Sequence, residues 1–132
     1  MKKFLRLSAG VQTLFRSISS VKLVYVFGSR AQGKTGSLSD YDFGIYLSEK
    51  DAKKRMAVRI TLISKLCKFL QTDAIDVTIL NDTRSPELKY HVIKDGFLIY
   101  QQEPYKVLIE PKILNEYFDF IDLLRLHGLT KA

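Results

Sequence analysis

Segments with the character of buried strands alternate with helical patterns along this chain, and this alternation limits its fold more than any other feature. Four segments rich in β-branched and aromatic residues are predicted as strands: 21–27, 41–47, 74–80 and 97–100. Taken with the helices between them, the order α-β-β-α-β-α-β-α indicates an α/β or α+β protein, with a short sheet flanked by helices.

Helical periodicity predicts helices over residues 4–19, 51–71 and 111–127, and Ser85 followed by Pro86 predicts the start of another that ends at Gly96. In the helix over 51–71, we expect one apolar stripe to face the core: Met56, Ile60, Ile63, Cys67 and Leu70. Its basic side chains are interpreted as a solvated face, so direct binding of nucleic acid is not expected. The aromatic last helix is expected to close the core or to contact a homo- or hetero-oligomeric partner.

The lengths of the connections predict a mixed sheet. About a dozen residues join the first two strands, which is the lower limit for a parallel crossover, so we expect an antiparallel pair. The second and third strands are separated by a helix and are expected to be parallel. The end of the first strand then lies beside the starts of the second and third. This rim would carry Gly28, Ser29, Asp40 and Asp76.

Length and composition indicate a single domain over residues 1–132. The one cysteine, Cys67, excludes an internal disulfide and a cysteine-based zinc cluster, as is typical of a reducing compartment. No apolar run approaches the roughly 20 residues that a membrane span needs. We therefore expect a cytoplasmic protein, and its formal charge of +7 would attract polyanions.

Two aspartates on the second strand predict a metal site. Asp40 and Asp42 are two residues apart, so both carboxylates project from the same face of the strand and repel each other. A hard divalent cation, Mg²⁺ above all, relieves that repulsion. Asp76 on the third strand reaches the same rim, and three carboxylates can hold two ions, an arrangement that suits nucleotidyl transfer. Asp73 is the alternative third carboxylate.

Gly28 and Ser29 predict a phosphate-binding turn. Glycine lets the backbone approach a phosphate closely, while the serine hydroxyl and successive N–H groups bind its oxygens. Arg30 adds positive charge nearby.

The run FGSRAQGKTGSLSDYD resembles the signature of the DNA polymerase β-like nucleotidyltransferase superfamily, in which Gly-Ser is followed after ten residues by Asp-x-Asp. The GSRAQG form, the short chain and the run HVIKDGFLIY resemble the minimal nucleotidyltransferases (MNT) within it, over roughly residues 20–101. Many MNT proteins are antitoxins encoded beside a HEPN-domain ribonuclease toxin.

The resemblance implies an enzyme that transfers AMP from ATP to a tyrosine of a HEPN toxin. By position, Gly28, Ser29 and Arg30 would hold the triphosphate, and Asp40, Asp42 and Asp76 would be catalytic and bind Mg²⁺, with Asp76 also the general base. Two alternatives stay open. One is an antitoxin that acts by binding alone, and the other is a small-molecule or RNA nucleotidyltransferase that needs a separate substrate-binding subunit.

Overall fold

The computed structural model describes residues 2–28 and 41–128, with side chains from residue 9 onward within those ranges. Along the chain its helices and strands are α1 (Lys2–Arg16), β1 (Val21–Phe27), β2 (Tyr41–Leu47), α2 (Ala52–Leu70), β3 (Ile75–Ile79), α3 (Pro86–Asp95), β4 (Phe97–Gln101) and α4 (Tyr105–Leu126). This order confirms the predicted alternation, and the first two strands have the predicted bounds.

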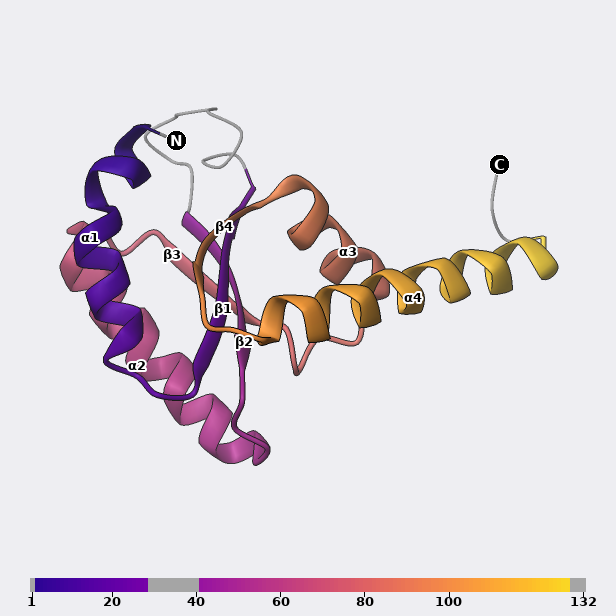
Figure 1. Cartoon of the computed structure of the whole chain (residues 1–132), viewed down its shortest axis with the longest axis horizontal. Coiled ribbons are helices and arrows are strands. Elements are labelled where there is room, and N and C mark those ends of the chain that lie inside the picture. The colour runs from indigo at the N-terminus through magenta and orange to yellow at the C-terminus, as the bar shows by residue number, and fades with distance from the viewer. Residues whose placement is uncertain (1, 29–40, 129–132) are drawn as a thin grey trace.

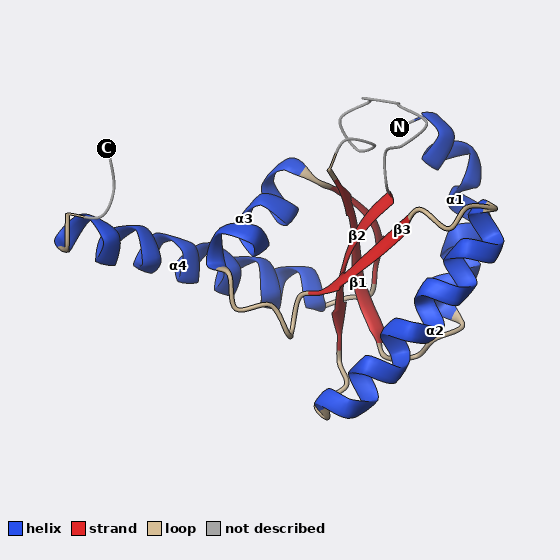
Figure 2. Cartoon of the chain, turned by 180° about the vertical axis from the view of Figure 1, so that it is seen from behind, coloured by secondary structure: helices blue, strands red, loops and turns tan. Residues whose placement is uncertain are grey.

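The sheet is mixed, as predicted, and its strand order is β3-β2-β1-β4. Figure 2 shows its strands in red. β1 pairs antiparallel with both β2 and β4, whereas β2 and β3 are parallel. The end of β1 therefore lies beside the starts of β2 and β3 at one rim of the sheet.

Helices cover both faces of the sheet, and each face has its own apolar core (Figure 1). α1 and α2 pack on one face through Phe15, Leu62 and Leu66, whereas α3 and α4 pack on the other through Val92, Ile109 and Ile113. Burial on both faces explains why the central strands are almost continuously apolar. No helix in the described ranges is both long and apolar enough to cross a membrane.

Local signals set the bounds of α3. The Ser85 side chain accepts a hydrogen bond from the Leu88 N–H at 3.1 Å, and Pro86 is the first helical residue. The helix ends at Asp95, where the Gly96 N–H donates to the Val92 carbonyl at 3.1 Å. These are the start and end that the sequence predicts.

The predicted apolar stripe on α2 is only partly right, because Ile63 and Leu70 pack against the core but two other members of the stripe do not. Leu62 and Leu66 are the buried residues of this helix, whereas Met56 is 53% exposed and Ile60 is 60% exposed. Cys67 is only half-buried. α2 carries apolar side chains on more than one stripe at helical spacing, so periodicity alone does not identify the stripe that faces the sheet.

The predicted bounds of the terminal helices also need correction. α1 ends at Arg16, three residues early, because the Ile18 N–H bonds the Phe15 carbonyl in a turn that leads into β1. α4 begins at Tyr105, six residues before the predicted start, and passes through Pro111. The prediction followed the apolar spacing of the later residues, whereas buried Ile109 anchors an earlier turn to the sheet.

One polar contact also joins α4 to the sheet. The buried Tyr25 hydroxyl of β1 donates a hydrogen bond to Oε2 of Glu110 at 2.5 Å. Burial, and then the hydrogen bond and charge of Glu110, raise the pKa of Tyr25 above its ordinary value. The folded protein therefore holds the phenol proton more tightly than the unfolded chain does.

We expect Tyr25→Phe to lower the free energy of unfolding at pH 7 by about 1.5–3 kcal/mol, because the Glu110 carboxylate loses its donor. Tyr46→Phe is the matched control, since its hydroxyl forms no hydrogen bond within the described residues. Urea denaturation measures the free energy of unfolding of both variants. An equal loss of stability in the two would contradict a specific role for the contact between Tyr25 and Glu110.

The same pair predicts an alkaline effect. Tyrosines of the unfolded chain ionise near pH 10, whereas folded Tyr25 stays protonated there, so its contribution to stability is present below about pH 10 and is lost above it. The decrease in stability above about pH 10 should therefore be smaller in Tyr25→Phe than in the wild-type chain, because the variant has no phenol at this position.

Candidate active site at the rim of the sheet

Residues from two strands and from the turn after a third meet at this rim. Gly28 directly follows β1, whose last residue, Phe27, is the Cα partner of Asp42 in β2. Asp42 is in turn the Cα partner of Asp76 in β3. Neighbouring strands lie about 4.8 Å apart, so the register brings two aspartates and a glycine to one place.

Gly28 lies under the Asp42 carboxylate. Its φ of +80° is in the left-handed region, which glycine occupies without strain. A Cβ at this position would come within 2.3 Å of Oδ2 of Asp42. Both the backbone conformation and the space above it therefore require glycine.

Asp42 and Asp76 project from the same face of the sheet, because paired residues of adjacent strands share a face. The burial pattern along β3 agrees, since Val77 and Ile79 are buried in the core on the other face whereas Asp76 is exposed. Asp73 lies in the turn before β3, outside the ladder that aligns Asp76 with Asp42. The register thus places Asp76 rather than Asp73 beside Asp42.

Arg59 of α2 is a neighbour of this site that the sequence interpretation missed. Its Nε donates to the carbonyl oxygen of Val77 at 2.7 Å, and its Nη2 lies 3.9 Å from Oδ1 of Asp76. The first contact covers a carbonyl of β3, an edge strand, and the second brings a positive charge to the carboxylates. In sequence, Arg59 looked like any other cation of the basic helix face.

The donor set fits Mg²⁺, which prefers carboxylate oxygens, and the Asp42–Asp76 pair supplies them from two rigid strands. Within the described ranges no group of three potential ligands gathers. The third predicted carboxylate, Asp40, lies outside the described residues, as do Ser29 and Arg30, and the roles of all three stay predictions.

The mixed sheet with helices on both faces matches the polymerase β-like nucleotidyltransferase fold. A sequence profile described as "Polymerase beta, Nucleotidyltransferase" matches residues 10–105. The chain belongs to this family.

Solved structures support the same fold. A chain of a toxin–antitoxin complex with AMP-PNP is 24% identical with a TM-score of 0.73, and the match covers 90% of this chain and 93% of that one. A chain of a Shewanella oneidensis complex between a tri-AMPylated HEPN toxin and an MNT antitoxin is 21% identical with a TM-score of 0.66, and the match covers 90% of each chain. A chain of an MntA-HepT toxin–antitoxin structure, also 21% identical with a TM-score of 0.66, covers 90% of this chain and 91% of its own. No curated protein sequence matches this chain.

We expect Gly28→Ala to displace the Asp42 carboxylate and to weaken Mg²⁺-dependent ATP binding by about tenfold or more, since a misplaced ligand costs over 1.4 kcal/mol. Gly128→Ala is the matched control, because Gly128 also has a positive φ, +65°, but nothing lies within 4 Å of its added Cβ. Calorimetric titration of both variants checks this. Equal ATP affinities would show that the space under Asp42 is unimportant.

Proposed function

We propose that this chain is a Mg²⁺-dependent nucleotidyltransferase that moves AMP from ATP to a tyrosine hydroxyl of a HEPN ribonuclease toxin, and so acts as its antitoxin. The observation that carries the proposal is the pairing of Asp42 with Asp76 across β2 and β3, with left-handed Gly28 beside them. Membership of the nucleotidyltransferase family supports the reaction class.

Each residue of the rim has a role in this reaction. Gly28 lets a phosphate approach the backbone, with Ser29 and Arg30 binding its oxygens. Asp42 and Asp76, together with Asp40, would hold two Mg²⁺ ions, which when bound neutralise the triphosphate and the leaving group. Arg59 keeps a positive charge near Asp76.

The transfer balances as a substitution at the α-phosphorus. The tyrosine oxygen forms a bond to this phosphorus, the bond to the bridging oxygen of the β-phosphate breaks, and pyrophosphate leaves. A tyrosine hydroxyl has a pKa near 10, so at neutral pH its attack needs a base. Asp76, which is exposed at the rim, accepts the phenolic proton in this proposal.

The acceptor is inferred from similar structures rather than from the rim. Among them are a toxin–antitoxin complex with AMP-PNP and a complex whose HEPN toxin is tri-AMPylated. Their chains match this one over about nine-tenths of its length, which supports a toxin as the acceptor.

ATP should bind tightly only in the presence of Mg²⁺, because its triphosphate must lie against carboxylates of the same sign. Calorimetric titration with Mg²⁺ and then with EDTA measures the difference. The same affinity in both solutions would refute the metal-bridged site.

Mixed with Mg²⁺, ATP and the HEPN protein encoded by the neighbouring gene, the wild-type chain should add units of about 329 Da, the mass of an AMP residue, to the toxin. We expect Asp42→Asn to slow this by on the order of 10³-fold through loss of a metal ligand. Asp76→Ala should abolish it, because the proposed general base and a proposed Mg²⁺ ligand are both lost. Intact mass spectrometry follows the product.

Asp73→Asn is the matched control, since it removes a nearby carboxylate that lies outside the ladder, and it should transfer AMP at the wild-type rate. If Asp73→Asn is inactive and Asp76→Ala active, the third carboxylate has been assigned wrongly. A toxin silenced without any gain of mass would indicate an antitoxin that acts by binding alone. Mass gained by RNA or a small molecule would indicate a different acceptor.

A further inference from the structure

The C-terminal half of α4 extends beyond the sheet as an arm (Figures 1 and 2). Apolar side chains along it are exposed. Phe118 is 52% exposed, Leu123 is 55% exposed and Leu126 is 80% exposed. Apolar side chains grouped on a projecting helix mark a surface that another molecule covers.

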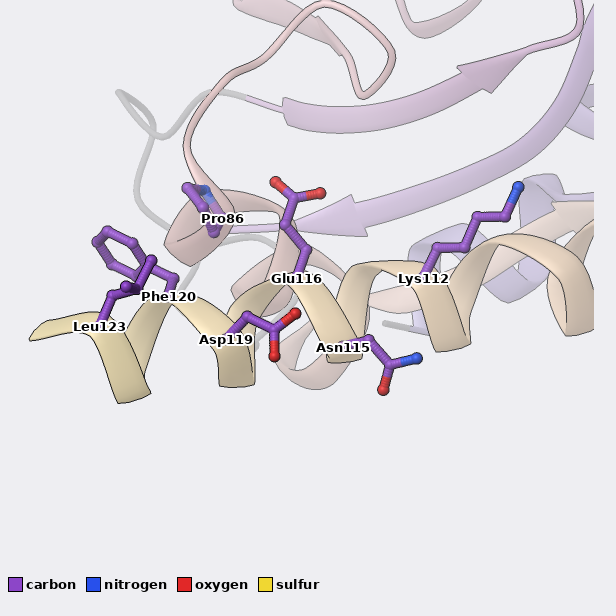
Figure 3. A pocket seen from close by; sticks show the side chains of 7 residues that line it. All are labelled: Pro86, Lys112, Asn115, Glu116, Asp119, Phe120 and Leu123. Atoms are coloured by element: carbon purple, nitrogen blue, oxygen red, sulfur yellow. The ribbon is translucent and has the colours of Figure 1, made fainter. Parts of the chain in front are cut away.

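A groove of about 560 Å³ runs along this arm beside the start of α3 (Figure 3). Pro86, Phe120 and Leu123 form its apolar end. Glu116 and Asp119 line it further along α4, together with Asn115 and Lys112. The lining residues of α4 recur at spacings of three and four, so they form one continuous stripe on the helix.

The middle of the arm is acidic, with Lys112 and Arg125 at its two ends, although the chain as a whole carries a formal charge of +7. Residues 113–124 contain three acidic residues and no lysine or arginine. Glu116 is paired with Lys89, whose Nζ lies 2.9 Å from Oε1. Asp119 and Asp122 form no ion pair within the described part of the chain. Two carboxylates without an ion-pair partner among the described residues therefore flank the apolar stripe.

Contacts with α3 hold the arm in place. The rings of Tyr90 and Tyr117 stack with centroids 3.9 Å apart and planes 5° apart, and the Lys89–Glu116 pair adds a second link. A surface held in its binding conformation loses little conformational entropy when a partner docks.

We propose that this α4 surface, formed by Pro86, Glu116, Asp119, Phe120, Leu123 and Leu126, docks an amphipathic helix of the acceptor toxin whose apolar ridge is flanked by lysine or arginine. The identity of the partner rests on the proposed function. A helix laid in the groove would cover Leu123 with its ridge and pair its cations with Asp119.

A second copy of this chain fits the surface less well. Two-fold symmetric dimers bring the same patch of each copy together, so the acidic stripe would face itself, and like charges at close range oppose association. A basic partner helix has the complementary charge.

The test measures the affinity of the neighbouring-gene HEPN protein for Leu123→Lys by calorimetry. We expect a loss of about tenfold or more, since an apolar anchor is replaced by a charge that repels a basic helix. Ile60→Lys is the matched control, because Ile60 is 60% exposed on α2, away from the arm, and it should leave the affinity unchanged. Mg²⁺-dependent ATP binding, unchanged in both variants, reports that each is folded.

A second pair of variants tests the charge. Asp119→Lys should weaken toxin binding and reduce its dependence on salt, whereas Glu103→Lys, an exposed position before α4, should do neither. In the AMP transfer assay, Leu123→Lys should raise KM for the toxin and leave kcat unchanged.

Three results would overturn the docking proposal: unchanged affinity of Leu123→Lys, no binding of the toxin by the wild-type chain, or a wild-type dimer that Leu123→Lys converts to a monomer. The proposed function fails separately. If the toxin binds through the arm but gains no AMP, the docking proposal stands and the proposed transfer reaction is wrong. If Leu123→Lys binds the toxin like wild type and AMP is still transferred, the transfer reaction stands and the docking proposal is wrong.

Discussion

The pairing of β2 with both of its neighbours is the constraint on which the rest of the structure depends. Antiparallel pairing with β1 and parallel pairing with β3 bring the end of one strand beside the starts of two others. Gly28, Asp42 and Asp76 come together only through this mixed arrangement. A shift of the β2–β3 register by one residue would turn Asp76 into the core under α1 and α2 and Val77 out of it, so burial of the apolar residues also holds the aspartates in alignment.

Burial of the sheet on both faces leaves its rim as the place for polar chemistry. On the α3 side, Gly44 admits the helix closely, because a Cβ there would come within 2.7 Å of Cγ1 of Val92. Asp42 lies two residues before Gly44, on the same face of β2. The carboxylate at the rim and the helices α3 and α4 therefore share one side of the sheet. A partner docked on the α4 surface would lie on that side, where the acceptor hydroxyl is needed.

Much of the fold and part of the site could be predicted because their signals are local. The bounds of β1 and β2, the Ser85–Pro86 start of α3 and its end at Gly96 depend on residues close together in the chain. The connections also indicated that β1 and β2 are antiparallel and that β2 and β3 are parallel, whereas the pairing of β4 with β1 was not predicted. The alternation of aspartate with apolar residues in β3 placed Asp76 on the side opposite the core.

Tertiary contacts decided what local patterns left equivalent. Several apolar stripes on α2 have helical spacing, and only the shape of the sheet face selects Leu62 and Leu66 over Met56 and Ile60. Contacts of Ile109 and Glu110 with the sheet begin α4 before Pro111. Arg59 differs from the other cations of α2 because β3 lies within its reach. The sequence by itself determined which residues form strands and which carboxylates they carry, since these depend on near neighbours, whereas helix faces and long-range partners depend on surfaces that exist only once the sheet has formed.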